Sequence, residues 1–527
     1  MVELTSEQPE DVLVPEFYNF ADVFDAHVGN IPDQSALLFL DETGRHRQVS
    51  YKELQVLANR CANAFKSQGI EAKDRVMVLC TRSIEAYVVY LALLKLGAVI
   101  MPGSEMLRST DILYRLQHAG AKAIVATGAI MNEVDSIRRQ APNVKLYISI
   151  EEKEHWLSLQ QLLDGASGSF ENVKTARTDT AFLSYTSGTT GKPKGVVHTY
   201  AWPHTHLAVA AKHWFDVQQG ELAWATAGPG WAKWIWSPFV SIIGNGGCAF
   251  IYKGRFDPKT YLSILKEYPI SVLCATPTEY RLMAKVDGLS EFKPKALRSA
   301  CSAGEPLNRE VIDTFQREFG ISVRDGYGQT ENSLLIGNLT NMTIRPGSMG
   351  KVIPGRRIGI IDGDGNPVEA NTVGDIAVHR SDLSLFQEYL YDPERTQAAL
   401  RGEWYITGDR GYYDEEGYFW FSGRSDDIII SSGYTIGPFE VEDALVKHPT
   451  VAECAAVASP DEIRGAVVKA FVVLKQNIEP SEQLMRELQE HVKAITAPYK
   501  YPRIIEFVAE LPKTPSGKIR RVELRTQ

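Results

Sequence analysis

The chain has 527 residues, which is too long for one ordinary hydrophobic core and predicts two or more domains. Hydrophobic residues make up 44% of the chain and charged residues 23%, as is usual for a soluble globular protein. The formal net charge of −9, from 56 basic and 65 acidic residues, argues against a nucleic-acid-binding protein, because such proteins usually present a basic surface.

The cysteines and the apolar segments narrow the class of protein further. The six cysteines lie far apart and none forms a C-x-x-C pair, so we expect reduced thiols in a cytoplasmic protein rather than a zinc site or a redox motif. The N-terminus is acidic and lacks the pattern of a secretory signal. The longest apolar segment, residues 86–102, is interrupted by Lys95, which favours a buried helix over a membrane span.

In chain order, short apolar runs alternate with segments of helical periodicity. Residues 15–70 predict surface helices, because residues 51–65 place their apolar side chains at helical spacing. Further along, the expected strands are 75–80, 123–126, 181–183, 222–226, 272–276, 297–301 and 321–324, and the expected helices include 84–96 and 109–117. This alternation is typical of an α/β domain with a largely parallel sheet.

A loop rich in glycine, hydroxyl and lysine side chains follows the apolar run at 181–183. Residues 184–195 read SYTSGTTGKPKG. Glycines let the backbone approach a ligand, hydroxyl and amide groups donate to oxygens, and lysines supply positive charge. A flexible linker is the alternative, but linkers rarely place KPKG directly after their glycines. The Walker A pattern is absent, because Pro193 stands where its second glycine is required. We therefore predict a phosphate-binding loop of another type.

Ligands of parallel sheets bind at the carboxyl ends of the strands, so the turns that follow strands are candidate ligand walls. Such turns are expected at residues 277–278 and 303–306, and a third at 325–331 (DGYGQTE). In the third, Tyr327 offers an aromatic face to a base, while Glu331 offers a hard carboxylate oxygen to Mg²⁺. Taken alone, this segment is equally compatible with an ordinary turn.

From about residue 340 to 425, short alternating runs between glycine-rich turns predict a small antiparallel β subdomain. WYITGDR at 404–410 and FSGRSDD at 421–427 are ambiguous by themselves, since a buried Asp in a turn and a surface Arg are both common. A compact unit large enough for its own core follows Arg424. Its expected strands are 427–431, 451–458, 466–474 and 504–508, and its expected helices are 440–447 and 481–494.

Over essentially its whole length, the chain strongly resembles the adenylate-forming superfamily of acyl-CoA synthetases, luciferases and peptide-synthetase adenylation domains. The resemblance rests on the order of residues 184–195, 325–331, 407–410, 423–427 and 512–518 (PKTPSGK). Medium-chain acyl-CoA synthetases are the most similar group, on residues 109–116 (STDILYRL), 230–233 (GWAK), 432–434 (SGY) and 436–442 (IGPFEVE).

The resemblance implies an α/β fold in two domains and an AMP-forming acid–CoA ligase. Residues 1–425 would form a large domain of mostly parallel α/β layers with the β subdomain at about 340–425. Residues 426–527 would form a small, mobile α+β lid domain. The acid would attack the α-phosphorus of MgATP to give an acyl-adenylate and pyrophosphate. The thiol of coenzyme A would then attack the acyl carbon and release AMP.

The resemblance also implies the site residues. The β- and γ-phosphates of ATP would be bound by Thr186, Ser187, Gly188, Thr189, Thr190, Gly191, Lys192 and Lys194. The adenine would be enclosed by Gly304, Glu305, Pro306, Asp325, Gly326 and Tyr327. Thr330 would bind the α-phosphate with Gly328 and Gln329 nearby, and Asp409 and Arg424 would bind the ribose. Catalytic roles fall on Lys518, Thr330 and Glu331, and Glu331 would also bind Mg²⁺. The hinge is Asp426, and CoA would contact Ser432, Gly433, Tyr434, Arg464, Tyr501 and Arg503.

Lys518 would act in the first step, because a positioned ammonium favours the charge that develops between carboxylate and phosphate oxygens. A solvated lysine in a basic tail is the alternative, and the PKTPSGK context favours the catalytic role. Acetylation of Lys518 by a lysine acetyltransferase, reversed by a deacetylase, would remove that charge. One departure from the medium-chain pattern is Thr435, where relatives commonly carry arginine, so no role is transferred to it.

The acid pocket is expected around residues 228–237 (GPGWAKWIWS), which crowd tryptophans together. Trp231 and Trp234 would shorten the pocket and exclude long-chain fatty acids, Trp236 would fill core, and Ala232, Gly337 and Asn338 are further pocket candidates. With no obvious cation for a second carboxylate, the expected substrate is a small to medium apolar monocarboxylic acid: straight, branched or aromatic.

Several alternatives stay open. An aryl-acid ligase of the benzoate type and a stand-alone enzyme that loads a carrier protein in trans share the same motifs. A luciferase-type oxygenase is disfavoured by the medium-chain motifs, and a non-catalytic nucleotide-binding protein by the retention of Lys518, Glu331 and Asp409. We expect a cytoplasmic enzyme of fatty acid metabolism that binds no nucleic acid and is compatible with homo-oligomer formation.

Overall fold

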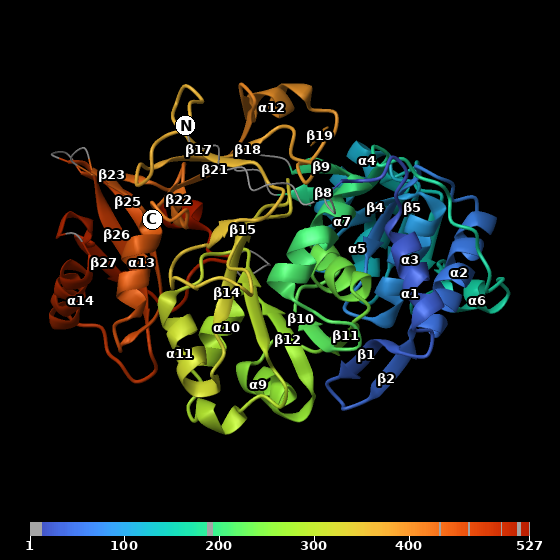
Figure 1. The fold of residues 1–527 in the computed structure, drawn as a ribbon, viewed down its shortest axis with the longest axis horizontal. Helices are drawn as coiled ribbons and strands as arrows, with labels where there is room; N and C mark the ends of the chain where they lie inside the picture. Colours follow the sequence, from blue (N-terminus) through green and yellow to red (C-terminus); the bar gives the residue numbers. More distant parts are fainter. Residues whose placement is uncertain are drawn as a thin grey trace.

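The computed structural model describes residues 13–186, 193–431, 434–461, 464–496, 498–513 and 518–525 (Figure 1). An eight-stranded sheet carries the strands that flank the predicted phosphate loop. In spatial order its strands are β19 (Glu388–Tyr389), β9 (Lys194–Thr199), β8 (Thr180–Thr186), β4 (Val99–Pro102), β3 (Arg75–Leu79), β5 (Ala123–Ala126), β6 (Leu146–Ser149) and β7 (Leu157–Ser158). The β8–β9 hairpin is antiparallel and the strands from β4 to β7 are parallel.

A nine-stranded sheet carries the other predicted ligand walls. Its order is β16 (Lys351–Val352), β15 (Leu334–Gly337), β14 (Val323–Gly328), β13 (Ser299–Ala303), β12 (Ile270–Ala275), β10 (Leu222–Ala225), β11 (Cys248–Lys253), β1 (Ser35–Asp41) and β2 (His46–Ser50). The six strands from β14 to β1 pair in parallel with one another, which confirms the predicted α/β fold with a largely parallel sheet.

One hydrophobic core joins the two large sheets. Between them lie α1 (Phe20–Asn30), α2 (Tyr51–Ser67), α3 (Ile84–Leu96), η3 (His206–Phe215) and η4 (Ile235–Ile243). Helix α3 is apolar on every side and is buried as expected, and Lys95 near its end is neutralised by Asp25 at 2.6 Å. Among the residues that the structure describes, no helix combines the length and the apolarity needed to cross a membrane.

The outer faces of the sheets are covered by further helices. These are α9 (Pro258–Glu267), α10 (Pro277–Ala284) and α11 (Arg309–Phe319) on the nine-stranded sheet, and α4 (Ser109–Ala119) and α5 (Ile130–Ile137) on the eight-stranded one. All six cysteines are free and buried, as expected. Both large sheets are thus covered on both faces, and their strand ends remain for ligands.

The expectation of surface helices throughout residues 15–70 is wrong. The β1–β2 hairpin occupies residues 35–50 between α1 and α2. Leu37 and Leu40 are buried because β1 pairs in parallel with β11, which lies more than two hundred positions later in the chain. Such a long-range pairing overrides the local helical pattern.

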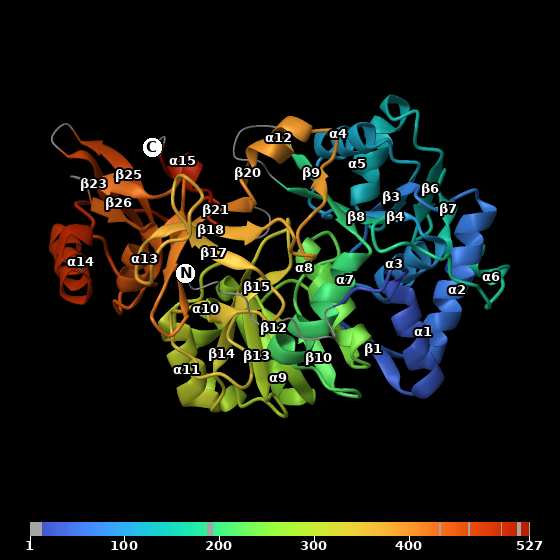
Figure 2. The same ribbon diagram turned by 45° about the horizontal axis from the view of Figure 1, so that its top comes forward.

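An antiparallel five-stranded sheet stands where the β subdomain was predicted. Its strands are β17 (Ile358–Ile361), β18 (Gly374–His379), β20 (Leu400–Arg401), β21 (Trp404–Tyr413) and β22 (Phe419–Arg424). The C-terminal lobe follows it and has its own hydrophobic core, built from β23 (Ile429–Ser431), β24 (Tyr434–Ile436), α13 (Pro438–Val446), β25 (Val451–Asp461), β26 (Gly465–Leu474), α14 (Glu482–Ile495), β27 (Ile504–Phe507) and α15 (Arg521–Arg525). Figure 2 shows this lobe beside the five-stranded sheet and α11.

Candidate active site

A buried carboxylate, Asp409, is the meeting point of three predicted motifs. Strands β21 and β22 pair so that Asp409 faces Arg424, whose Nη1 donates to Asp409 Oδ1 at 3.2 Å. From β14, the Tyr327 hydroxyl donates to Asp409 Oδ2 at 2.6 Å, and just beyond it Gln329 Nε2 donates to the same oxygen at 2.7 Å. Burial raises the pKa of Asp409, and the charge of Arg424 opposes that shift. The cluster offers fixed acceptors and donors for the hydroxyl groups of a ligand.

The second predicted carboxylate, Glu331, lies beside Lys194 at the start of β9. Lys194 Nζ is 3.1 Å from Glu331 Oε1, and the Tyr389 hydroxyl donates to the same oxygen at 3.0 Å. Lys194 Nζ also donates to the Tyr389 hydroxyl at 2.7 Å. The structure therefore brings a lysine of the phosphate loop to the candidate metal ligand, with a tyrosine that joins them.

These residues fit a magnesium ion that is shared with phosphate groups. Glu331 is buried and presents a hard carboxylate oxygen, which Mg²⁺ prefers. Within the described part of the chain, the buried hydroxyls of Ser184 and Thr186 on β8 have no hydrogen-bond partner, so they are available to a ligand. Among the described residues, no group of three or more His, Cys, Asp or Glu side chains could hold a metal ion, so phosphate and water oxygens would have to complete the coordination.

His198 supports the backbone of Thr330 from behind. Its Nε2 donates to the Thr330 carbonyl oxygen at 2.5 Å, and its ring stacks on Trp202 with centroids 4.6 Å apart. Burial lowers the pKa of His198 to about 4, so the ring is neutral near pH 7. The neutral ring fixes the carbonyl and leaves the Thr330 side chain to the site.

Within the predicted adenine wall, Asp325 is buried, whereas Glu305, Pro306 and Tyr327 are half-buried. Burial raises the pKa of Asp325 to about 7, and the positive charge of Lys233 opposes the rise. Lys233 Nζ donates to the Ala303 carbonyl oxygen at the end of β13, at 2.7 Å. Next along the chain, Gly304 has a φ of +111°, a backbone conformation that favours glycine.

Lys518 of the C-terminal lobe reaches this wall. The carboxylates of Glu305 and Asp409 favour its charged form, whereas the cations Lys233 and Arg424 disfavour it. Desolvation by the surrounding protein is the largest influence and lowers the pKa of the Lys518 ammonium below its usual range. The lysine predicted to be catalytic therefore lies among the residues predicted to bind ATP.

The predicted turn at 325–331 is in part a strand. Strand β14 continues to Gly328 and pairs with β15, and the turn begins only at Gln329. Its glycines serve close packing rather than a turn, because a Cβ on Gly326 would lie 2.6 Å from the Leu334 side chain and one on Gly328 would lie 2.0 Å from the Ser333 carbonyl oxygen. The carboxylate of Glu331 is nonetheless presented after the strand end, as expected.

Several predicted residues lie outside the described part or remain apart from this cluster. Those outside the described residues are Ser187, Gly188, Thr189, Thr190, Gly191, Lys192, Ser432 and Gly433. Among the CoA candidates, Arg503 Nη1 donates to the Tyr501 hydroxyl at 2.8 Å beside α14, and Arg464 is exposed. The expected hinge residue, Asp426, lies 3.5 Å from Arg424 Nε.

The tryptophans of the expected acid pocket differ in their surroundings. Trp231 is 38% exposed, whereas Trp234 is buried against Tyr87 and Tyr90, with ring centroids 4.9 and 4.6 Å away. Trp236 is buried in the core, as expected. The other pocket candidates, Ala232 and Asn338, are half-buried and buried, and a Cβ on Gly337 would lie 3.1 Å from the Trp214 ring.

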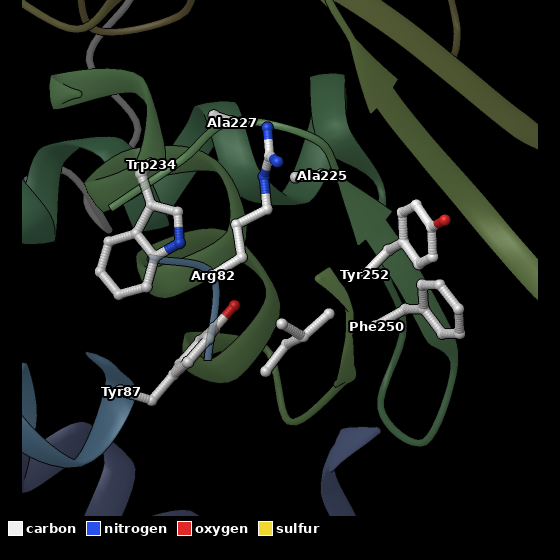
Figure 3. Close-up of a pocket in the computed structure, with 8 residues that line it drawn as sticks. Arg82, Tyr87, Ala225, Ala227, Trp234, Phe250 and Tyr252 are labelled. Carbon is white, nitrogen blue, oxygen red and sulfur yellow. The ribbon is translucent and has the colours of Figure 1, made fainter. Parts of the chain in front are cut away.

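Trp234 also lines a small cavity together with Arg82 and Tyr87. Figure 3 shows these three side chains around the cavity. The cavity has a volume of about 10 Å³, which is room for one water molecule rather than for an acid. Arg82 is tied to the backbone, because its Nε donates to the Thr226 carbonyl oxygen at 3.0 Å. Trp234 and Tyr87 thus pack against each other and leave little free volume between them and Arg82.

Sequence reasoning missed Tyr389, Lys233 and His198 as site residues. Tyr389 lies on a two-residue strand with no recognisable motif, and it reaches Glu331 only because β19 pairs with β9. Lys233 appeared only within the segment at 230–233, and His198 was not singled out. The charge of Lys233 among tryptophans was a usable signal, whereas nothing in the sequence distinguishes Tyr389.

Comparison with known proteins decides the family. The AMP-binding enzyme family matches residues 24–390, and the AMP-binding enzyme C-terminal domain matches residues 440–518. The chain belongs to the AMP-binding enzyme family. An uncharacterized acyl-CoA ligase of Bacillus subtilis (strain 168), YtcI, is 53% identical to this AMP-binding enzyme over 98% of the chain and 97% of its own length. The human mitochondrial acyl-coenzyme A synthetase ACSM3 is 42% identical over 97% of the chain and 90% of its own length.

Solved structures agree with this membership. The anthranilate CoA ligase AuaEII, in complex with anthranoyl-AMP, is 29% identical, with a TM-score of 0.92 and 98% of both chains covered. A benzoate CoA ligase from Burkholderia xenovorans LB400 is 30% identical, with a TM-score of 0.86 over 96% of this chain and all of its own. This AMP-binding enzyme is an AMP-forming acid–CoA ligase that uses ATP, Mg²⁺, CoA and a carboxylic acid.

Proposed function

We propose that this ligase activates a small to medium apolar monocarboxylic acid. The observation that carries the proposal is the combination of Lys518 beside Glu305 and Asp409 with a neighbouring region crowded by tryptophans. Trp234 and Trp236 are buried in that region. An acid that enters past the exposed Trp231 therefore meets apolar side chains within a short distance. Large aromatic side chains favour a short apolar acyl group over a long chain.

In the first step, the formation of the acyl-adenylate, each site residue would have a separate task. Asp409 and Arg424 would hold the ribose, and Lys194 would hold the terminal phosphates. Glu331 would hold the Mg²⁺, which supplies charge neutralisation at the phosphates when it is bound. Lys518 would place its ammonium between the acid and the α-phosphate, where negative charge develops.

A panel of acids tests the proposed substrate class. We expect CoA-dependent AMP formation with acids between acetate and decanoate, including branched acids, when ATP and Mg²⁺ are present. Pyrophosphate release without any CoA-dependent product would favour the enzyme that loads a carrier protein. No pyrophosphate release with any acid would contradict the proposed function.

An aryl acid is the second candidate, because the ligases for anthranilate and benzoate align over nearly the whole chain. Planar rings also suit a pocket bordered by tryptophan. The same panel therefore includes benzoate and anthranilate. A higher kcat/KM for benzoate than for every aliphatic acid would replace the aliphatic proposal by this one.

The finer features also remain proposals. We place the boundary between the two domains at Asp426, with CoA contacts from Tyr434, Arg464, Tyr501 and Arg503 on the smaller one. We further propose a cytoplasmic location, a homo-oligomer and control by acetylation of Lys518. The expected result for acetylation is loss of activity after incorporation of acetyl-lysine at 518, and full activity of that protein would contradict it.

A further inference from the structure

A chain of side-chain hydrogen bonds connects the candidate ligand wall at residues 303–306, called the Glu305 wall below, to the C-terminal lobe. On helix α10, Arg281 Nη2 donates to Glu305 Oε2 at 3.0 Å. The other terminal nitrogen of the same guanidinium donates to Asn308 Oδ1 at 3.1 Å. Asn308 Nδ2 then donates to Asp443 Oδ1 on α13, across the boundary between the lobes, at 3.2 Å. The wall beside Lys518 is thus joined to the lobe that carries Lys518.

Asn308 is unusual because it stands at the N-cap position of α11. An asparagine there ordinarily accepts a hydrogen bond from the first turn of its own helix, which stabilises a protein by about 1 kcal/mol. The side chain of Asn308 makes no such bond and is 4% exposed. Its amide instead accepts from Arg281 and donates to Asp443.

The chemistry of the three partners fixes the direction of this chain. Arginine only donates and an ionised aspartate only accepts, so an uncharged link between them must do both. The amide of Asn308 is such a link, and its orientation follows from its partners. Asp443 is held in place as well, since its other oxygen accepts from Lys447 Nζ at 2.7 Å.

We propose that Asn308 is a positioning residue that couples the Glu305 wall to the orientation of the C-terminal lobe. A nucleotide that orders Glu305 also orders Arg281 and Asn308, and thereby favours the lobe orientation that keeps Lys518 at the site. Coupling between two sites is reciprocal, so docking of the lobe also prepares the wall for the nucleotide. The inference rests on the proposed role of Lys518 in adenylation.

Substitutions at Asn308 and Asp443 test this coupling. Asn308→Asp keeps the size of the side chain and its capping ability, but it sets a second carboxylate against Asp443. We expect adenylation, measured as pyrophosphate release, to fall about tenfold, a usual size for such coupling. Thioester formation from supplied acyl-adenylate and CoA should not fall.

The double variant Asn308→Asp/Asp443→Asn restores a donor opposite an acceptor, and we expect it to recover most of the adenylation rate. The exchange reports on the contact itself. A residue that only supports the fold would slow both half-reactions alike. Lys285→Met is the matched control. Lys285 Nζ also donates across the boundary, to the Ala452 carbonyl oxygen, but its contact is not part of the Glu305 chain.

Lys285→Met should leave adenylation closer to the unmodified rate than Asn308→Asp does, because its contact with Ala452 does not include Glu305. Unchanged adenylation in Asn308→Asp, or no recovery in the exchanged pair, would overturn the proposal. Failure of the proposed function gives a different result, since the unmodified enzyme would then release no pyrophosphate with any acid.

Discussion

The hydroxyl of Tyr389 joins the two charged residues that the site places at the phosphates. Tyr389→Phe removes only that hydroxyl, which donates to Glu331 and accepts from Lys194. Hydrogen bonds to charged groups contribute about 1.5–3 kcal/mol, so we expect pyrophosphate release to slow by about tenfold or more. Thioester formation from supplied acyl-adenylate should be unaffected.

Tyr391→Phe is the control for this substitution. Tyr391 is exposed, and its hydroxyl accepts from Arg75 at 2.9 Å, away from Glu331. Equal slowing in both variants would mean that the Tyr389 hydroxyl has no specific role.

The buried carboxyl of Asp325 predicts a pH dependence of stability. Its pKa in the fold is about 7, above the ordinary value of 3.8, so the folded state binds a proton more tightly than the unfolded state. Its contribution to the free energy of unfolding is therefore complete below about pH 4 and is lost as the pH rises towards and past 7.

Asp325→Asn removes this titration and keeps an oxygen for the Gly326 N–H, which donates to Asp325 Oδ1 at 2.9 Å. Relative to the unmodified protein, we expect the Tm of the variant to rise between about pH 5 and about pH 8. A Tm difference that is constant over this range would contradict the burial argument.

At the scale of elements, the register between β14 and β15 positions the turn that carries Glu331. Gly328→Ala would force a Cβ to within 2.0 Å of the Ser333 carbonyl oxygen, and a backbone atom cannot easily move aside. We expect the free energy of unfolding to fall by about 1–3 kcal/mol or more and the rate of pyrophosphate release to fall as well. Urea unfolding measures the first effect.

Gly363→Ala is the matched control, because nothing lies within 4 Å of a Cβ at that turn. It should leave stability within about 0.5 kcal/mol of the unmodified protein. If both alanine variants are equally stable, the close approach at Gly328 is not what holds the turn.

Local elements with strong periodicity were predictable, and those that depend on distant partners were not. Helix α3 begins and ends where its apolar pattern does, at Ile84 and Leu96. The β1 strand was read as helical because its partner β11 is far away in the chain. The extension of β14 through Gly328 was likewise hidden, since glycines ordinarily mark turns and here permit close packing against β15.

At the scale of the molecule, the ordered motifs predicted which segments matter but not how they meet. Asp409 and Arg424 become neighbours through strand pairing, and Tyr327 reaches them from another sheet. Neither arrangement can be derived from spacing in the sequence. The same holds for Asn308, whose partners Arg281 and Asp443 lie on two other helices.

The proposed adenylation step requires that the C-terminal lobe bring Lys518 to a site built by the rest of the chain. The most direct measurement compares the two half-reactions in the Lys518→Ala variant. We predict that pyrophosphate release falls by about a hundredfold or more, a usual size for loss of a charge that stabilises the transition state, while thioester formation from supplied acyl-adenylate and CoA continues at the unmodified rate. An equal loss of both half-reactions would contradict the account.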